Sequence, residues 1–163
     1  MIRRLLYLLV LYFAIGLQLS LAAPIPGLGW DIDIVLIILV MIAARTGRGE
    51  AVIWAALTGL ALDAFNPAAM GGQLVAKATA IFLLGVLIDA MNLEQPLLLG
   101  ATIMLLTFLE HIIFRLFTPF LKQFGWAILY FDLPSAILTA IFGFFILWMA
   151  MRANIFTPRV SED

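Results

Sequence analysis

The sequence predicts an all-α membrane protein, on the evidence of its composition and the length of its apolar runs. Of its 163 residues, 65% are apolar and only 12% are charged, whereas soluble domains are about half apolar and about a quarter charged. The bilayer core cannot hydrogen bond to the backbone, so a spanning segment must be a helix of about 20 apolar residues or a strand of a closed barrel. Because the runs here are long and unbroken, we predict helices.

Six apolar stretches predict one integral membrane domain that covers residues 1–163. The breaks between them contain proline, glycine or asparagine, which interrupt helices, and none of the breaks is long enough to hold a second domain. The first stretch is similar to a secretory signal, but its apolar run is longer than a typical signal core, so we expect a retained helix. The predicted spans are residues 5–23, 31–44, 51–70, 73–90, 97–116 and 132–151.

The distribution of cations predicts that both termini face the cytoplasm, because short loops rich in Lys and Arg stay on that side. With six spans that start inside, Lys122 alone would lie outside. Tryptophan prefers the headgroup level, and the placement of Trp54 and Trp148 near inner ends and of Trp30 and Trp126 near outer ends agrees with this orientation. The cations that would lie inside are Arg3, Arg4, Arg45, Arg48, Arg152 and Arg159.

Three charged residues lie far from the predicted inner loops, and we expect them to form an intramembrane polar pair or pocket. At about 1.5 Å per helical residue, Asp63, Lys77 and Glu110 lie roughly 20, 18 and 21 Å above the inner face. An unpaired charge at this depth costs several kcal/mol, so we predict that Asp63 pairs with Lys77 or shares a pocket with it. Capping does not explain Asp63, because it ends an outward-going helix, where the macrodipole is negative.

The remaining charges near the outer side have simpler interpretations. Asp31, Asp33 and Asp132 stand where helices begin, and carboxylates are favoured at such N-caps. Arg115 is expected to extend toward the outer headgroups. Because these groups gather in the outer half of the bundle, we expect a polar cavity or a docking surface that opens outward.

Aromatic side chains gather between the fifth and sixth spans around one cation, Lys122. Such a stretch can lie in the membrane interface, or it can form an apolar surface that binds a partner, and the residues alone leave both interpretations open. The candidate surface comprises Phe117, Phe120, Phe124, Trp126 and Tyr130.

The sequence contains few residues of the types that bind nucleic acid, bind metal or act in catalysis. Nine Lys and Arg against ten Asp and Glu leave no basic excess for nucleic acid, and the absence of Cys together with a single His excludes thiolate zinc sites and multi-histidine sites. Ser135 and His111 could form a nucleophilic dyad, but nothing marks an oxyanion hole beside them. We therefore expect no catalytic residue, no metal and no cofactor.

Four segments of the chain share a pattern with a known family. They are the run 31–45, the sequence Gly59-Leu60-Ala61-Leu62-Asp63, the turn Gly71-Gly72 and the start of the last span at Leu133-Pro134-Ser135. In these segments, in its length and in its span count, the chain resembles the rod shape-determining membrane protein MreD family. The resemblance makes Gly59, Asp63, Gly71, Gly72 and Pro134 family-like structural positions.

This resemblance implies a non-enzymatic scaffold of the bacterial cell-elongation machinery in the inner membrane. Members bind MreC, a bitopic membrane protein, and help to connect cytoplasmic MreB filaments with RodA and a class B penicillin-binding protein, which links peptidoglycan synthesis to cell shape. The family is also similar in overall form to the substrate-binding subunits of energy-coupling vitamin transporters. That similarity implies an alternative function, the capture subunit of a small-molecule (vitamin-type) membrane transporter.

Overall fold

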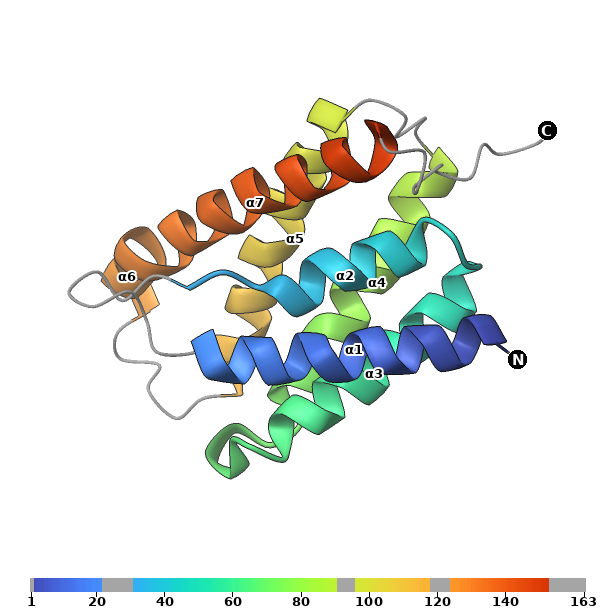
Figure 1. Cartoon of the computed structure of the whole chain (residues 1–163). Helices are drawn as coiled ribbons and strands as arrows, with labels where there is room; N and C mark the ends of the chain where they lie inside the picture. Colours follow the sequence, from blue (N-terminus) through green and yellow to red (C-terminus); the bar gives the residue numbers. More distant parts are fainter. Residues whose placement is uncertain (1, 22–30, 91–95, 118–123, 153–163) are drawn as a thin grey trace.

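The structure is a computed structural model that describes residues 2–21, 31–90, 96–117 and 124–152, and the regular structure within these ranges is entirely helical (Figure 1). Short helical segments are η1 (Pro67–Ala69), α6 (Phe124–Ala127) and the π-helical turn η3 (Ile128–Asp132). The longer helices are α1 (Ile2–Leu21), α2 (Ile34–Ala43), α3 (Arg48–Asp63), α4 (Gly72–Ala90), α5 (Pro96–Leu116) and α7 (Leu133–Arg152).

Three stretches of helix are long and apolar enough to cross a membrane: Ile2–Ser20, Leu97–Leu116 and Ile128–Arg152. Their outward faces carry large exposed apolar side chains, such as Phe13 on α1 and Phe145 on α7. A soluble monomer rarely exposes such extended apolar surface. Composition and surface together indicate a protein that lies in a membrane.

The longer helices alternate in direction along the chain (Figure 1). The beginning of α1 and the end of α7 therefore lie at the same side of the molecule, on the right in Figure 1. The ends of α1, α3 and α5 lie at the opposite side, together with the beginnings of α2, α4 and α7. We call this second side the distal side.

Helix α2 is the central element, in contact with α1, α3, α4, α5 and α7. Its side chains Val35, Leu36, Ile37 and Val40 are completely buried. A helix that is buried on every side needs no polar face, which explains why the sequence of α2 is apolar all round. The core of the protein is built around α2.

Helix α2 is shorter than the predicted span of residues 31–44. It has only 10 residues, and a helix of that length reaches about 15 Å, half of a hydrocarbon core of about 30 Å. Residues 31–33 approach it as non-helical chain, and Asp33 is its N-cap. The N-terminus of α2 therefore lies inside the bundle. The side chains that form hydrogen bonds with residues 31–34 belong to the candidate site.

Candidate functional site

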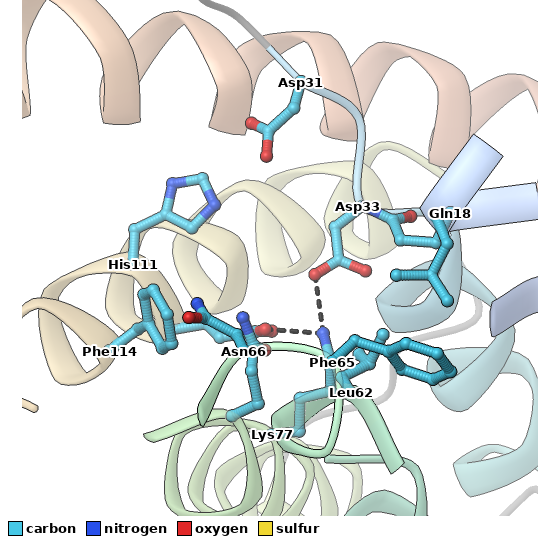
Figure 2. Close-up of a pocket in the computed structure, with 12 residues that line it drawn as sticks. Gln18, Asp31, Asp33, Leu62, Phe65, Asn66, Lys77, His111 and Phe114 are labelled. Atoms are coloured by element: carbon cyan, nitrogen blue, oxygen red, sulfur yellow. Dashed lines mark hydrogen bonds and ion pairs between the residues drawn. The ribbon is translucent and has the colours of Figure 1, made fainter. Parts of the chain in front are cut away.

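A buried lysine joins three helices in the interior of the bundle. Lys77 of α4 is only 1% exposed, and its Nζ donates to Asp33 Oδ2 at 2.6 Å and to Glu110 Oε1 at 2.5 Å (Figure 2). Asp33 precedes α2 and Glu110 belongs to α5. The ammonium is stabilised by two carboxylates from different helices, which satisfies a charge that would otherwise be costly in a low-dielectric interior.

Asp33 caps the N-terminus of α2 and also pairs with Lys77. Its Oδ1 accepts the Leu36 backbone N–H at 2.7 Å, which caps α2, while its Oδ2 accepts from Lys77. The sequence interpretation of Asp33 as an N-cap agrees with this geometry. The second carboxylate oxygen links the N-terminus of α2 to α4 through Lys77, a contact that the N-cap pattern does not predict.

The non-helical approach to α2 has its backbone N–H groups satisfied by side chains from neighbouring helices. Ser135 Oγ accepts the Asp31 N–H at 3.1 Å, Thr139 Oγ1 accepts the Asp33 N–H at 3.0 Å, and Gln18 Oε1 accepts the Ile34 N–H at 2.9 Å. Non-helical backbone is tolerated at membrane depth only where the protein supplies such partners. Ser135 therefore has a structural use at the start of α7.

The predicted pairing of Asp63 with Lys77 is wrong. Asp63 is 0% exposed, and its two carboxylate oxygens accept the backbone N–H groups of Gln73 at 2.9 Å and Leu74 at 3.0 Å. Although Asp63 ends α3, it thus caps the N-terminus of α4, where the macrodipole is positive and four N–H groups lack helical partners. The macrodipole of α3 disfavours a carboxylate at Asp63, whereas the macrodipole of α4 favours it.

Gly59 lies one turn before Asp63 and brings the two helices close enough for this cap. A Cβ on Gly59 would lie 2.5 Å from Leu74 Cα and 2.6 Å from the Gln73 carbonyl oxygen, both of which are backbone atoms. The turn that leads into α4 contains Gly71 at φ +88°, in the left-handed region that favours glycine. Gly59, Asp63 and Gly71 therefore act at a single junction between α3 and α4.

Arg115, which is expected to extend toward the outer headgroups, forms an ion pair with Asp132. Its Nε lies 2.5 Å from Asp132 Oδ2, and its Nη2 lies 2.7 Å from Oδ1. This two-pronged geometry is the preferred contact between guanidinium and carboxylate. His111 Nδ1 lies 3.7 Å from the same Asp132, so Asp132 joins α5 to the beginning of α7.

A cavity of about 230 Å³ lies beside the Lys77 ion pairs (Figure 2). Its lining includes the exposed residues Phe65 and Asn66, so it reaches the surface at the turn between α3 and α4, on the distal side. In the predicted orientation this is the outer side. The full lining is Gln18, Leu19, Asp31, Asp33, Leu62, Phe65, Asn66, Gln73, Lys77, Glu110, His111 and Phe114.

Some polar atoms of the residues that line this cavity are buried without a hydrogen-bond partner among the described residues. They are Glu110 Oε2, Gln73 Oε1 and His111 Nδ1. Buried polar atoms are rarely left unpaired, because desolvation without a new bond costs about 1–3 kcal/mol. The described residues contain no cluster of three or more His, Cys, Asp or Glu that could hold a metal ion.

The candidate aromatic surface is described in part. Phe117, Trp126 and Tyr130 are exposed, and the rings of Trp126 and Tyr130 lie 6.0 Å apart. Phe120 and the side chain of Phe124 lie outside the described residues. Pro134 is the second residue of α7 and directly follows the π-helical turn η3.

Sequence reasoning found Lys77 and Glu110, which the structure brings together, but it missed Asp33 as the partner of Lys77. It also missed Gln18 and Gln73, which enter the cavity from α1 and α4. For the role of Asp63 as a cap of α4, the sequence does contain one signal. The turn before α4 reads Gly71-Gly72 and offers no Ser, Thr, Asp or Asn as a cap, so a capping group had to come from elsewhere.

Protein-family models, curated proteins and solved structures were all compared with this chain, and none of them matches it.

Proposed function

We propose that the protein is an MreD-like scaffold of the bacterial cell-elongation machinery, built as six spans with both termini in the cytoplasm. The scaffold would bind an MreC-like bitopic membrane protein and, through it, RodA, a class B penicillin-binding protein and cytoplasmic MreB. This proposal includes no catalytic step. Its support comes from the residues that carry the resemblance and from an exposed aromatic surface.

The observation that carries the proposal is the junction between α3 and α4. Gly59, Asp63 and Gly71 belong to the segments that resemble the family, and they meet at one junction. A glycine followed four residues later by an aspartate is a weak motif when only the sequence is considered. It gains weight because these residue types have a physical task here: a small residue permits the close approach, and a carboxylate caps the incoming helix.

The partner surface of this proposal is formed by Phe117, Trp126 and Tyr130 beside the distal ends of α5 and α7. Exposed aromatic side chains are enriched at protein interfaces, where they contribute large contact area at low entropic cost. An MreC-like partner crosses the membrane once and continues on the outer side. The distal side is the outer side in the proposed orientation, so such a partner could contact this surface.

Co-purification tests the scaffold directly. The tagged protein, extracted in mild detergent, should retain an MreC-like partner at near-stoichiometric amounts, and cells that lack the protein should lose their rod shape and become round. A preparation that contains no such partner, from cells that keep their shape without the protein, would refute the proposal.

Trp126→Ala tests the aromatic surface. We expect the variant to fold normally and to retain at least tenfold less partner, because an aromatic anchor of an interface contributes about 2 kcal/mol or more. Tyr12→Ala is the matched control: Tyr12 is 72% exposed on α1 and Trp126 is 74% exposed. Equal retention by the two variants would place the partner elsewhere.

The span count and orientation can be tested independently, because the chain has no cysteine. Gly47 and Gly125 are both exposed, and a side chain at either position would meet no atom within 4 Å. Gly125→Cys should react with a membrane-impermeant maleimide in intact cells, whereas Gly47→Cys should react only after the cells are opened. The reverse result, or labelling of both in intact cells, would contradict the proposed topology.

The cavity favours a second candidate function, the capture subunit of a small-molecule transporter. Its polar lining and its opening at the distal side are what a capture site for an outside solute requires. A capture subunit should bind a metabolite when isolated and should need no MreC-like partner. If the purified protein carried a vitamin-like ligand and no partner, this function would replace the scaffold.

A further inference from the structure

We propose that the distal cavity is a binding site for a primary ammonium group, which donates hydrogen bonds to Glu110 and Gln73. The inference rests on the cavity and its lining, and it goes beyond the scaffold function. It assigns a ligand class, a small primary amine or an amine-bearing headgroup, to residues that the scaffold does not need.

The acidic side chains that line the cavity favour a cationic ligand. Asp33 and Glu110 are two buried carboxylates, and Lys77 supplies one ammonium between them. Asp31 lies in the same lining, so three carboxyl groups and one ammonium group line the cavity. A lining with more acidic than basic side chains favours a cationic ligand over an anionic one.

The unpaired acceptors indicate that this cation carries N–H donors. Glu110 is 2% exposed, and while its Oε1 accepts from Lys77, its Oε2 has no partner in the described part of the chain. Gln73 Oε1 lines the same cavity and is also without a partner there. A primary ammonium has three donors in a compact group, which suits two or more separate acceptors.

The rest of the lining fits the carbon chain of an amine. Leu62, Phe65 and Phe114 contribute apolar surface, and aromatic rings also attract cations through their faces. A volume of about 230 Å³ is below the range of about 300–1,000 Å³ for drug-sized ligands, so the bound group is small. A divalent metal is less suitable, because no group of three or more His, Cys, Asp or Glu in the described ranges is placed so that it could hold a metal ion.

The same ammonium chemistry has two sources beside a membrane, a free amine such as ethanolamine or the headgroup of phosphatidylethanolamine. Both present a primary ammonium. Phosphatidylcholine is the matched lipid without N–H donors, and tetramethylammonium is the matched soluble cation. These pairs separate recognition of donors from attraction of positive charge alone.

The experiment measures binding to the full chain purified in an uncharged detergent. Methylammonium and ethanolamine should bind in calorimetry and raise the thermal unfolding midpoint, whereas tetramethylammonium and sodium at equal ionic strength should bind at least tenfold more weakly. In parallel, nanodiscs that contain equal amounts of phosphatidylethanolamine and phosphatidylcholine should be analysed by native mass spectrometry. Selective retention of phosphatidylethanolamine, with no binding of soluble amines, would assign the headgroup as the source.

Variants tie the binding to the named atoms. Glu110→Gln should weaken binding of the amine, or retention of the lipid, by at least tenfold, because an amide has one acceptor oxygen where the carboxyl group has two, and it cannot carry a negative charge. Gln73→Met keeps the side-chain length and removes one acceptor, so it should weaken binding several-fold; it carries the test if Glu110→Gln does not fold. Glu50→Gln is the matched control: Glu50 stands in the first turn of α3, pairs with Arg4 and is not part of the cavity lining, so binding of the amine should be unchanged.

Three outcomes would overturn the inference. One is the absence of binding by both soluble amines at millimolar concentration together with equal retention of the two lipids. Another is equal affinity for methylammonium and tetramethylammonium. The third is unchanged binding in both Glu110→Gln and Gln73→Met. None of these measurements involves an MreC-like partner, so the scaffold proposal stands or fails separately.

Discussion

The carboxylate of Asp63 caps a helix other than its own: Asp63 Oδ2 accepts the Leu74 N–H at 3.0 Å, across the junction of α3 and α4. In water, the free N–H groups at the start of a helix can bind solvent. Inside a membrane protein they need a partner from the chain itself. This contact therefore fixes how α3 and α4 meet, and several predictions concern the residues around it.

Asp63→Ala should destabilise the protein by about 1–3 kcal/mol, because it leaves two buried N–H groups without acceptors. Asp63→Asn should cost less, since the amide oxygen can still accept one of the two N–H groups. The measurement is the thermal unfolding midpoint in detergent. A larger loss for Asp63→Asn than for Asp63→Ala would show that capping is not the role of this residue.

Gly59→Ala should cost about 1–3 kcal/mol, because the new Cβ would overlap the backbone of Leu74 and force the two helices apart. Gly16→Ala, in the middle of α1, is the control. A Cβ at Gly16 meets nothing within 4 Å, and alanine favours a helix over glycine by about 0.5–1 kcal/mol, so this variant should be neutral or more stable. A similar loss in both variants would contradict the close approach at Gly59.

Lys77→Met should destabilise the protein by about 3–5 kcal/mol, since it leaves Asp33 and Glu110 as unpaired buried carboxylates. Adding Glu110→Gln should recover part of this loss, so that the double variant is more stable than the sum of the single changes predicts. The corresponding cycle with Asp63→Asn should show weaker coupling, because Lys77 pairs with Asp33 and Glu110. Strong coupling of Lys77 with Asp63 would overturn the assignment of partners.

Thr139→Val should cost about 1–3 kcal/mol, because the buried Asp33 N–H loses its acceptor while the side-chain volume is kept. Thr107→Val provides a matched comparison. Thr107 is equally buried, but its hydroxyl donates to the Ile103 carbonyl within its own helix, and that carbonyl keeps its helical partner. Equal unfolding midpoints for the two variants would show that the approach to α2 does not depend on Thr139.

The helices could be predicted closely from sequence, except for α2 and the end of α3: the third span is predicted to continue to residue 70, whereas α3 ends at Asp63 and a turn with the short helix η1 follows it. The long apolar helices were identified because burial in lipid and burial in protein both require continuous apolar side chains, and proline, glycine and asparagine mark the breaks. Helix α2 was predicted to begin at residue 31, yet it begins at Ile34. The difference arises because side chains of α1 and α7 satisfy residues 31–34, and sequence periodicity contains no information about these contacts.

The candidate site divides in a similar way. Lys77 and Glu110 were recognisable because charges within apolar stretches must be compensated. Depth estimates place residues along the membrane normal but not around it, so Asp63 and Asp33 could not be distinguished as partners of Lys77. Similarly, Arg115 could not be assigned to Asp132 before the arrangement of α5 beside the start of α7 was known.

The sequence by itself predicts a membrane environment for this protein and identifies the charged residues that such an environment disfavours. Both depend on residue type alone, through hydropathy and the cost of an isolated charge. Only the tertiary structure decided which charges meet, which helix Asp63 caps and where unpaired acceptors surround a cavity. These depend on the rotation of each helix about its axis, which is set by packing between helices that are distant in the chain.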